Sequence, residues 1–345
     1  MQRYIDFFVE KKKAKNKFVH LKMIFKRLKA LFNPEIYHGW GKSKKYFEGW
    51  YFKIVNADET KAFAIIPGIS MDLKGNQQSF IQVLDGKNLS AEYLKFSADE
   101  FQPNPNKFEV TIKDNYFSKN KIRLNLPTIN GELEFKNNVS WPNSFLSPGI
   151  MGPFSFVPFM QCYHGIVSMN HTISGKLIIN NDEVDFTNGK GYLEKDWGNS
   201  FPSAYIWMQS NHFSNPTISI KASVAKIPWL KSSFVGFIAG VLIDDKIIQF
   251  TTYNFTKLKK SFADKNHVEI ELENKNYKLT IFAKREKATA LASPILGFMD
   301  GRIEESMTAN LEVILYDKKA KKIILQDVGR NAGLEVAGNI EEIIT

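Results

Sequence analysis

The sequence predicts an all-β protein that consists of two tandem antiparallel β-barrels preceded by a short basic amphipathic helix. Its 345 residues exceed the usual size of one domain, about 100 to 200 residues. The 28 Phe and 12 Tyr favour strands over helices. Short aromatic and β-branched runs alternate with polar turns along nearly all of the chain, which is typical of consecutive antiparallel strands.

The first 32 residues carry most of the net charge of +10. They contain ten Lys or Arg and two acids, a net charge of +8, which leaves +2 for the rest of the chain. One helical face combines Ile24, Leu28, Leu31 and Phe32. Two interpretations stay open: a solvated leader helix, or a helix that contacts an anionic membrane surface. Because residues 1–32 lack the apolar stretch of a signal peptide or a membrane span, we expect a cytoplasmic protein, peripheral at the membrane in the second case.

The segment 33–190 is predicted to form the first barrel. Pro34 disfavours helix at the residue before it, so the helix ends there. Strand-like runs follow at short spacing: YFEGWYFKIV, AFAIIPGI, SFIQVLDG, FEVTIKD and IRLNL. Three prolines interrupt the Phe- and Met-rich first part of segment 143–177, which indicates an apolar loop that covers a core or lines a pocket.

The segment 191–341 is predicted to form the second barrel. It repeats the rhythm of strands and turns, and Trp50 and Trp207 lie 157 positions apart, as do Phe80 and Phe237. Two matches at one offset indicate a tandem duplication. Closure into barrels would remove the exposed sheet edges, and a barrel of this size can enclose one small apolar ligand. A pair of β-sandwiches is the alternative architecture.

Several classes of function are not expected. The nearly neutral body gives no support for nucleic-acid binding, and phosphate-binding glycine loops and HExxH zinc motifs are absent from the sequence. The single cysteine, Cys162, excludes an intrachain disulfide. The seven-residue spacing of His164 and His171 puts their side chains on opposite faces of a strand. We therefore expect neither a metal nor a cofactor.

The stretch GKGYLEKDWGNSFPSAYIWMQ, residues 189–209, concentrates ionisable and aromatic residues. On a strand, Glu194 and Asp196 share one face, and Lys195 and Trp197 share the other. Two adjacent carboxylates cannot both ionise freely, and burial raises the pKa of a carboxylic acid further, so one of them could act as a general acid. The alternative is a surface strand with solvated charges.

Three blocks of the sequence carry a resemblance to a known family. They are IYHGWGKSKKYFEGWYFKIV, GYLEKDWGNSFPSAYIWMQ and LEVILYDKKAKKIILQDVGRNAGLEVAG, in this order between residues 36 and 339. Together they resemble the tocopherol cyclase family, which is related to carotenoid 1,2-hydratases and AttH-like proteins. The resemblance implies two lipocalin-like (calycin-type) barrels. Asp196 departs from the family pattern, which has Asn at this position.

The resemblance also implies a reaction and a set of site residues. Tocopherol cyclases protonate a prenyl double bond of a hydroquinone, and the phenol oxygen closes a chromanol ring; in the hydratases, water traps the cation. The catalytic residues would be Glu194 as proton donor, with Asp196 and Lys195 beside it. On the family pattern, Tyr192, Trp197 and Trp207 would be aromatic residues of the pocket. We expect Trp50, Tyr205 and His164 to bind the hydrophobic isoprenoid-type ligand as well, although His164 is not part of the family pattern. Three further hypotheses remain: a hydratase that adds water to an isoprenoid alkene, a non-catalytic lipocalin-like carrier of an isoprenoid or other apolar lipid, and a membrane-associated scaffold without a pocket.

Overall fold

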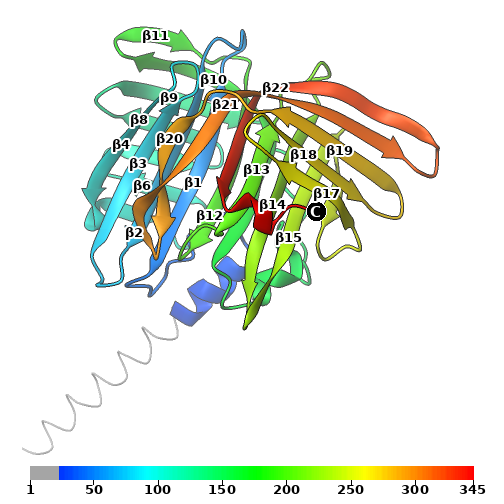
Figure 1. Ribbon diagram of the computed structural model, residues 1–345. Coiled ribbons are helices and arrows are strands. Elements are labelled where there is room, and N and C mark those ends of the chain that lie inside the picture. Colours follow the sequence, from blue (N-terminus) through cyan, green and yellow to red (C-terminus); the bar gives the residue numbers. More distant parts are fainter. Residues whose placement is uncertain (1–22) are drawn as a thin grey trace, which may run out of the picture.

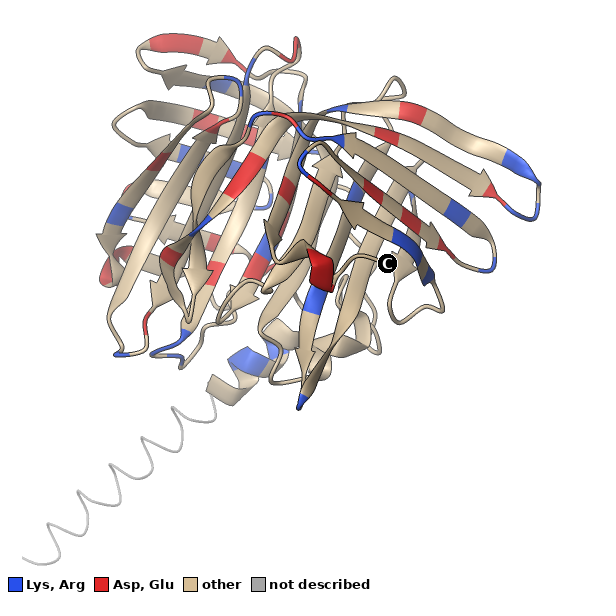
Figure 2. Ribbon diagram, viewed as in Figure 1, with Lys and Arg blue, Asp and Glu red and all other residues tan. Residues whose placement is uncertain are grey.

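The computed structural model describes residues 23–345 and confirms an all-β protein with two antiparallel sheets (Figure 1). Of the predicted helix 1–32, residues 1–22 lie outside the described residues, and residues 23–31 are helical. Ile24 and Leu28, two residues of the predicted apolar face, are 40% and 51% exposed. Figure 2 shows Lys and Arg on this helix. Among residues 23–345, the helices are too short or too polar to span a bilayer.

The first sheet contains twelve strands. They are β1 (Tyr46–Val55), β2 (Ala62–Met71), β3 (Gln77–Asp85), β4 (Ser90–Ser97), β5 (Phe101–Pro103), β6 (Glu109–Ile112), β7 (Asn115–Ser118), β8 (Lys121–Asn125), β9 (Ile129–Lys136), β10 (Cys162–Ile179), β11 (Asp182–Asp185) and β12 (Gly189–Gly198). Two 3-10 turns belong to this half, η1 (Ala98–Glu100) and η2 (Gly152–Phe156).

The second sheet contains ten strands. They are β13 (Ala204–Ser210), β14 (Ser219–Trp229), β15 (Ser232–Ile243), β16 (Lys246–Thr251), β17 (Lys257–Ala263), β18 (His267–Glu273), β19 (Tyr277–Lys284), β20 (Thr289–Ile295), β21 (Phe298–Asp317) and β22 (Lys322–Gly338). A last 3-10 turn, η3 (Ile340–Glu342), follows β22.

The two sheets share one topology but are not closed barrels. Their strand orders run β4-β3-β2-β1-β12-β10-β9-β8-β7-β6-β5 and β16-β15-β14-β13-β22-β21-β19-β18-β17. In each half the two edge strands follow one another in the chain, yet they do not pair. In the first half, β5 has only three residues and ends at Pro103, which has no N–H to donate to a further ladder. The prediction of closed barrels is therefore corrected to two curled open sheets.

The repeat exists in the strand order, but the offset of 157 does not describe it. Trp50 packs in the core of the first half, whereas Trp207 packs between the two sheets. Side chains alternate along a strand, so an alignment shifted by one residue from the structural equivalence pairs residues that lie on opposite faces. Phe80 and Phe237 show the same exchange: the core residue of β3 beside Phe80 is Ile81, whereas Phe237 itself lies in the core of its half.

The boundary between the halves also differs from the prediction. A boundary at 190/191 would fall inside β12, which pairs with both β1 and β10 of the first sheet. The chain crosses to the second sheet in the turn between Gly198 and Ala204. The central strand β12 therefore belongs to the first half, and the second half begins with β13 at Ala204 and extends past Ile343, which is buried in its core.

Three apolar clusters hold the molecule together. One fills each half, and the third lies between the sheets and includes Tyr51, Tyr192, Trp207 and Met307. All seven residues of β13 are buried, because this strand has apolar packing on both faces. Burial of each such large side chain contributes about 1.5–3 kcal/mol, so the third cluster fixes the two sheets against each other. It also forms the wall of the pocket described next.

Candidate functional site

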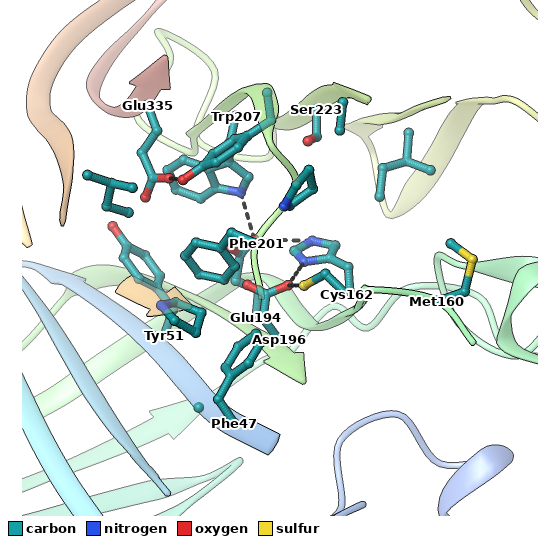
Figure 3. A pocket seen from close by; sticks show the side chains of 18 of the residues that line it. Phe47, Tyr51, Met160, Cys162, Glu194, Asp196, Phe201, Trp207, Ser223 and Glu335 are labelled. Atoms are coloured by element: carbon teal, nitrogen blue, oxygen red, sulfur yellow. Dashed lines mark hydrogen bonds and ion pairs between the residues drawn. The ribbon is translucent and has the colours of Figure 1, made fainter. Parts of the chain in front are cut away.

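A pocket of about 180 Å³ opens between the two sheets (Figure 3). Its apolar wall comes from both sheets and from the segment 143–161, where Met151, Phe154 and Met160 face it. Of the two alternatives for the first part of segment 143–177, covering a core or lining a pocket, the residues before β10 take the second. An enclosed apolar cavity of comparable size accepts a benzene ring. The ionisable groups that line it are His164, Glu194, Asp196, Lys221, Glu305 and Glu335.

The carboxyl group of Glu194 projects from β12 into this pocket and is 4% exposed. Its Oε2 accepts hydrogen bonds from the hydroxyl of Tyr192 and from Nε1–H of Trp207, the latter at 3.1 Å. Burial raises the pKa of Glu194, opposed by His164 and reinforced by the charge of Asp196. The two donors stabilise the carboxylate that remains after the acid releases its proton.

An aspartate–histidine pair stands next to this acid. His164 on β10 and Asp196 on β12 are cross-strand neighbours, and Nδ1 of the imidazole lies 2.7 Å from Oδ1 of Asp196. A carboxylate only accepts hydrogen bonds, so Nδ1 carries the proton and Nε2 faces Glu194, 3.4 Å from its Oε2. Atoms of these three residues lie within 4.8 Å of one another, close enough to hold a metal ion.

Two further carboxyl groups enter the pocket from the second sheet. Glu305 on β21 and Glu335 on β22 are directly opposite one another, and Glu335 is in turn opposite Trp207 on β13. Tyr51 donates a hydrogen bond to Glu305, and Tyr205 donates one to Glu335 at 2.6 Å. Burial raises the pKa of Glu305 to about 7 and raises that of Glu335 well above its usual value.

Lys195 lies on the opposite face of β12, away from the pocket. Its Nζ is 2.5 Å from Oε1 of Glu48, and both side chains are fully buried. Burial lowers the pKa of Lys195 to about 8, which Glu48 opposes. The ammonium group also bonds the carbonyl of Pro34 at 3.2 Å, and Glu48 accepts the N–H of Gly39 at 3.1 Å. The predicted catalytic residue Lys195 therefore anchors the segment before β1 instead of facing the acid.

Two predicted ligand-binding aromatics also lie outside the pocket. Trp50 is fully buried and stacks on Phe108, with centroids 5.2 Å apart, and Trp197 stacks on His38 at 4.1 Å. Both share the Lys195 side of the first sheet, because Trp50 pairs with Lys195 across strands β1 and β12. Tyr192 reaches the site through its hydroxyl group. Of the remaining predicted residues, His164, Tyr205 and Trp207 line the pocket with Glu194 and Asp196.

The second histidine of the candidate metal pair does not join the site. Two register shifts interrupt the pairing of β10 with β12, between Ile166 and His171. His171 nevertheless points away from the pocket and packs against Phe135, with ring centroids 4.6 Å apart. The predicted separation of His164 and His171 on opposite faces agrees with this arrangement.

Sequence reasoning missed Tyr51, Lys221, Glu305 and Glu335. Two of these, Lys221 in SIKASVA and Glu335 in AGLEVAG, are single charged residues in otherwise apolar stretches, whereas Glu305 directly follows Glu304. Such an isolated charge could have drawn attention to Lys221 and Glu335. Whether such a side chain points inward depends on the pairing register, and β21 and β22 have three register shifts between Ser306 and Tyr316.

The two-sheet fold with a buried acid in an apolar pocket suits an enzyme of the cyclase type, and the comparisons with known proteins support this class. The chain belongs to the tocopherol cyclase-like family, whose model matches residues 103–338. This agrees with the resemblance found in the sequence blocks.

Known proteins show the same relationship. The chain is 21% identical over 378 residues to a probable chloroplastic tocopherol cyclase of Oryza sativa subsp. japonica, covering 90% of this chain and 80% of that protein. It is 24% identical over 194 residues to a chloroplastic tocopherol cyclase of Zea mays, covering 52% and 40% of the two chains. The crystal structure of CghA with Sch210972 shares the fold, with a TM-score of 0.52, 10% identity and coverage of 86% and 89%.

Proposed function

We propose that the protein protonates a double bond of a prenylated hydroquinone or related isoprenoid and closes a chromanol ring. The observation that carries this proposal is the Glu194 carboxyl group, buried in an apolar pocket with two hydrogen-bond donors on one of its oxygens. The protonated acid is favoured by burial, and its conjugate base is stabilised by Tyr192 and Trp207.

In the proposed reaction, Glu194 transfers its proton to the less substituted alkene carbon. The π electrons form the new C–H bond and leave a tertiary cation on the neighbouring carbon. The aromatic rings of Tyr205, Trp207 and Phe201 line the pocket and stabilise positive charge. The phenol oxygen attacks the cation, forms the C–O bond and loses its own proton. Because the pocket wall is mainly apolar, the internal phenol oxygen is favoured over water as the nucleophile.

The aspartate–histidine pair has a role in the same proposal. Asp196 keeps its bond to Nδ1 of His164, and Nε2 faces Glu194. The Asp196 side chain is 24% exposed, whereas Glu194 is buried. The imidazole therefore connects the buried acid to solvent and returns a proton to Glu194 after each turnover.

Replacement of Glu194 by Gln tests the acid. Turnover of geranylhydroquinone should fall by about 100-fold or more, since general acids contribute about 10² to 10⁴. Liquid chromatography with mass spectrometry measures the product: an unchanged mass at a new retention time indicates cyclisation, and a gain of one water indicates hydration. Glu304→Gln, at the exposed neighbour of Glu305, is the matched control. Unchanged turnover in Glu194→Gln would show that another group supplies the proton.

A carrier function is the second candidate, because the pocket wall is mainly apolar and comes from both sheets. A carrier would bind geranylhydroquinone and release it unchanged after prolonged incubation, and Glu194→Gln would have no effect on recovery. The same chromatographic measurement therefore separates the two functions.

We also propose that the enzyme reaches its substrate at a membrane surface through residues 1–32 and their neighbours. On the helix 23–31, Ile24, Phe25 and Leu28 are 40%, 69% and 51% exposed. Lys26, Arg27 and Lys29 accompany them on the same short helix. Exposed apolar groups combined with basic residues are typical of helices that bind anionic membranes.

A further inference from the structure

The pocket holds a second acidic pair on the wall opposite Glu194. Trp207, Glu335 and Glu305 occupy facing positions on the adjacent strands β13, β22 and β21 of the second sheet. Glu194 comes from the first sheet, where its cross-strand neighbour is Tyr51. Figure 3 shows Glu194, Tyr51 and Glu335 around one pocket. The two sheets thus present separate acidic groups to the same ligand volume.

The described part of the chain does not supply a hydrogen-bond donor for every carboxyl oxygen of Glu305 and Glu335. Glu305 is 1% exposed, and its Oε1 accepts the hydrogen bond of Tyr51. Its Oε2 is buried and has no hydrogen-bond partner among residues 23–345. A buried carboxyl oxygen without a partner destabilises the folded protein, so a ligand group that donates a hydrogen bond to it would bind favourably. The side chain lines the pocket, so a ligand hydroxyl is a suitable partner.

The carboxyl groups of Glu305 and Glu335 can together both donate and accept a proton. Burial raises the pKa of Glu305 to about 7, and burial together with Glu305 raises that of Glu335 further. Two carboxyl groups at facing strand positions disfavour ionisation of both at once in an apolar site. Near neutral pH, the pair therefore retains a proton while keeping the capacity to accept another.

We propose that Glu305 and Glu335 form a head-group site that binds a phenolic hydroxyl of the substrate and accepts its proton during ring closure. This inference rests on the proposed function. As the C–O bond forms, the electrons of the phenol O–H bond stay on oxygen and the proton moves to the Glu305 carboxylate. Glu194 has meanwhile lost one proton to carbon, so each turnover moves one proton from Glu194 to the pair. Exchange with solvent after product release restores both groups.

Binding of two probes tests this site without requiring turnover. The probes are geranylhydroquinone and its di-O-methyl ether, which cannot donate a hydrogen bond, and quenching of tryptophan fluorescence gives each Kd. The native protein should prefer the free hydroquinone by about tenfold or more, as expected for hydrogen bonds to charged groups. Glu305→Leu and Glu335→Leu should bring the ratio close to one, whereas Glu304→Gln should keep it.

The conservative variant separates positioning from proton transfer. Glu305→Gln can still accept the Tyr51 hydrogen bond, so it should fold and bind the hydroquinone, but it cannot take up the proton as a carboxylate does. We expect kcat to fall by about tenfold or more with KM little changed, and the kcat–pH profile to lose its dependence near pH 7. Retention of the native binding preference in both Leu variants, or native kcat in Glu305→Gln, would overturn the inference.

Failure of this inference and failure of the proposed function give different results. If Glu194→Gln abolishes turnover while the Leu variants keep the binding preference, only the head-group site is wrong. If the Leu variants lose the preference while Glu194→Gln turns over normally, the head-group site stands and the acid assignment is wrong. A native protein that binds neither probe contradicts both.

Discussion

At the scale of single residues, the Glu305 carboxyl group sits in surroundings that favour its protonated form. Burial raises its pKa from 4.5 to about 7, and the charge of Glu194 acts in the same direction. The hydrogen bond from Tyr51 and the charge of Lys53 oppose this shift. Glu335, at the facing strand position, also has a raised pKa. The folded chain therefore binds this proton more tightly than the unfolded chain.

This difference predicts how stability changes with pH. Below pH 4.5 both states are protonated and the stabilisation is fully present; it is lost as the pH rises to about 7, because only the unfolded chain ionises freely over that range. Glu305→Gln resembles the neutral acid at every pH. When the pH rises from 4.5 to 8, the native protein should lose free energy of unfolding through this group. The Glu305→Gln variant should lose about 1–3 kcal/mol less over the same range. Urea denaturation measures this, with Glu304→Gln as control. Parallel curves for Glu305→Gln and the native protein would mean that Glu305 titrates normally.

At the scale of the strand, β12 shows what could be predicted from the sequence and what could not. The two-residue spacing of Glu194 and Asp196 predicted their shared face, and Lys195 lies on the other face as the alternation requires. The partner of Lys195 is Glu48, which lies far away in the sequence, and nothing local to either residue indicates the pair. The catalytic role of Lys195 followed from the family resemblance and not from this alternation, and only the long-range packing of β12 against β1 shows that Lys195 pairs with Glu48.

The same limit explains the larger differences. Strands and their order of succession follow from local patterns of aromatic and β-branched residues, so the all-β class and two-part plan were predictable. Closure depends on whether the two edge strands of each half pair with each other, and β5 is too short and ends in Pro103. The head-group pair depends on the register of β21 and β22, which is shifted at several points.

The buried Lys195–Glu48 pair predicts a large cost for its removal. Lys195→Met leaves the Glu48 carboxylate buried without its cation, beside the N–H groups of His38 and Gly39. Breaking such a pair costs about 3–5 kcal/mol in the free energy of unfolding. The exposed pair of Lys176 and Glu183 supplies the control, because solvent screens this pair and Lys176→Met should change the free energy of unfolding little. Urea denaturation compares the two variants, and equal costs would exclude a structural role specific to Lys195.

At the scale of the whole molecule, exposed apolar side chains gather near the helix 23–31. Phe32 stacks on Phe145 at 5.1 Å, and Phe159 packs on Trp229 at 5.5 Å, so the helix, the segment 143–161 and the β14–β15 turn adjoin. The β14–β15 turn ends near the helix in Figure 1. We define the apolar end by its most exposed members, which are Phe25, Leu28, Phe145, Leu146, Phe159 and Leu230. Patches of this kind mark surfaces that contact proteins or membranes.

The position of the apolar end connects it to the pocket. Phe156 and Phe159 are 43% and 53% exposed, whereas Phe154 and Met160 in the same segment line the pocket. One short segment thus faces the ligand on one side and solvent on the other. An isoprenoid dissolved in a bilayer could enter the pocket along this segment without crossing water. Transfer through water would cost about 25 cal/mol for each Å² of apolar surface that becomes exposed.

We therefore expect substitutions at the apolar end to weaken binding to anionic vesicles. Leu146 and Leu230 are 76% and 81% exposed, and burial of a Leu side chain is worth about 1.5–3 kcal/mol, so the double variant Leu146→Glu/Leu230→Glu should bind at least tenfold more weakly. Flotation with vesicles of phosphatidylcholine and phosphatidylglycerol measures this. Ile323→Glu is the control, because Ile323 is 51% exposed on the β21–β22 hairpin, far from the helix in Figure 1. Higher salt should weaken binding of the native protein, since the helix contributes Lys26, Arg27 and Lys29. Equal flotation of the double variant and the control would show that this end does not enter the bilayer.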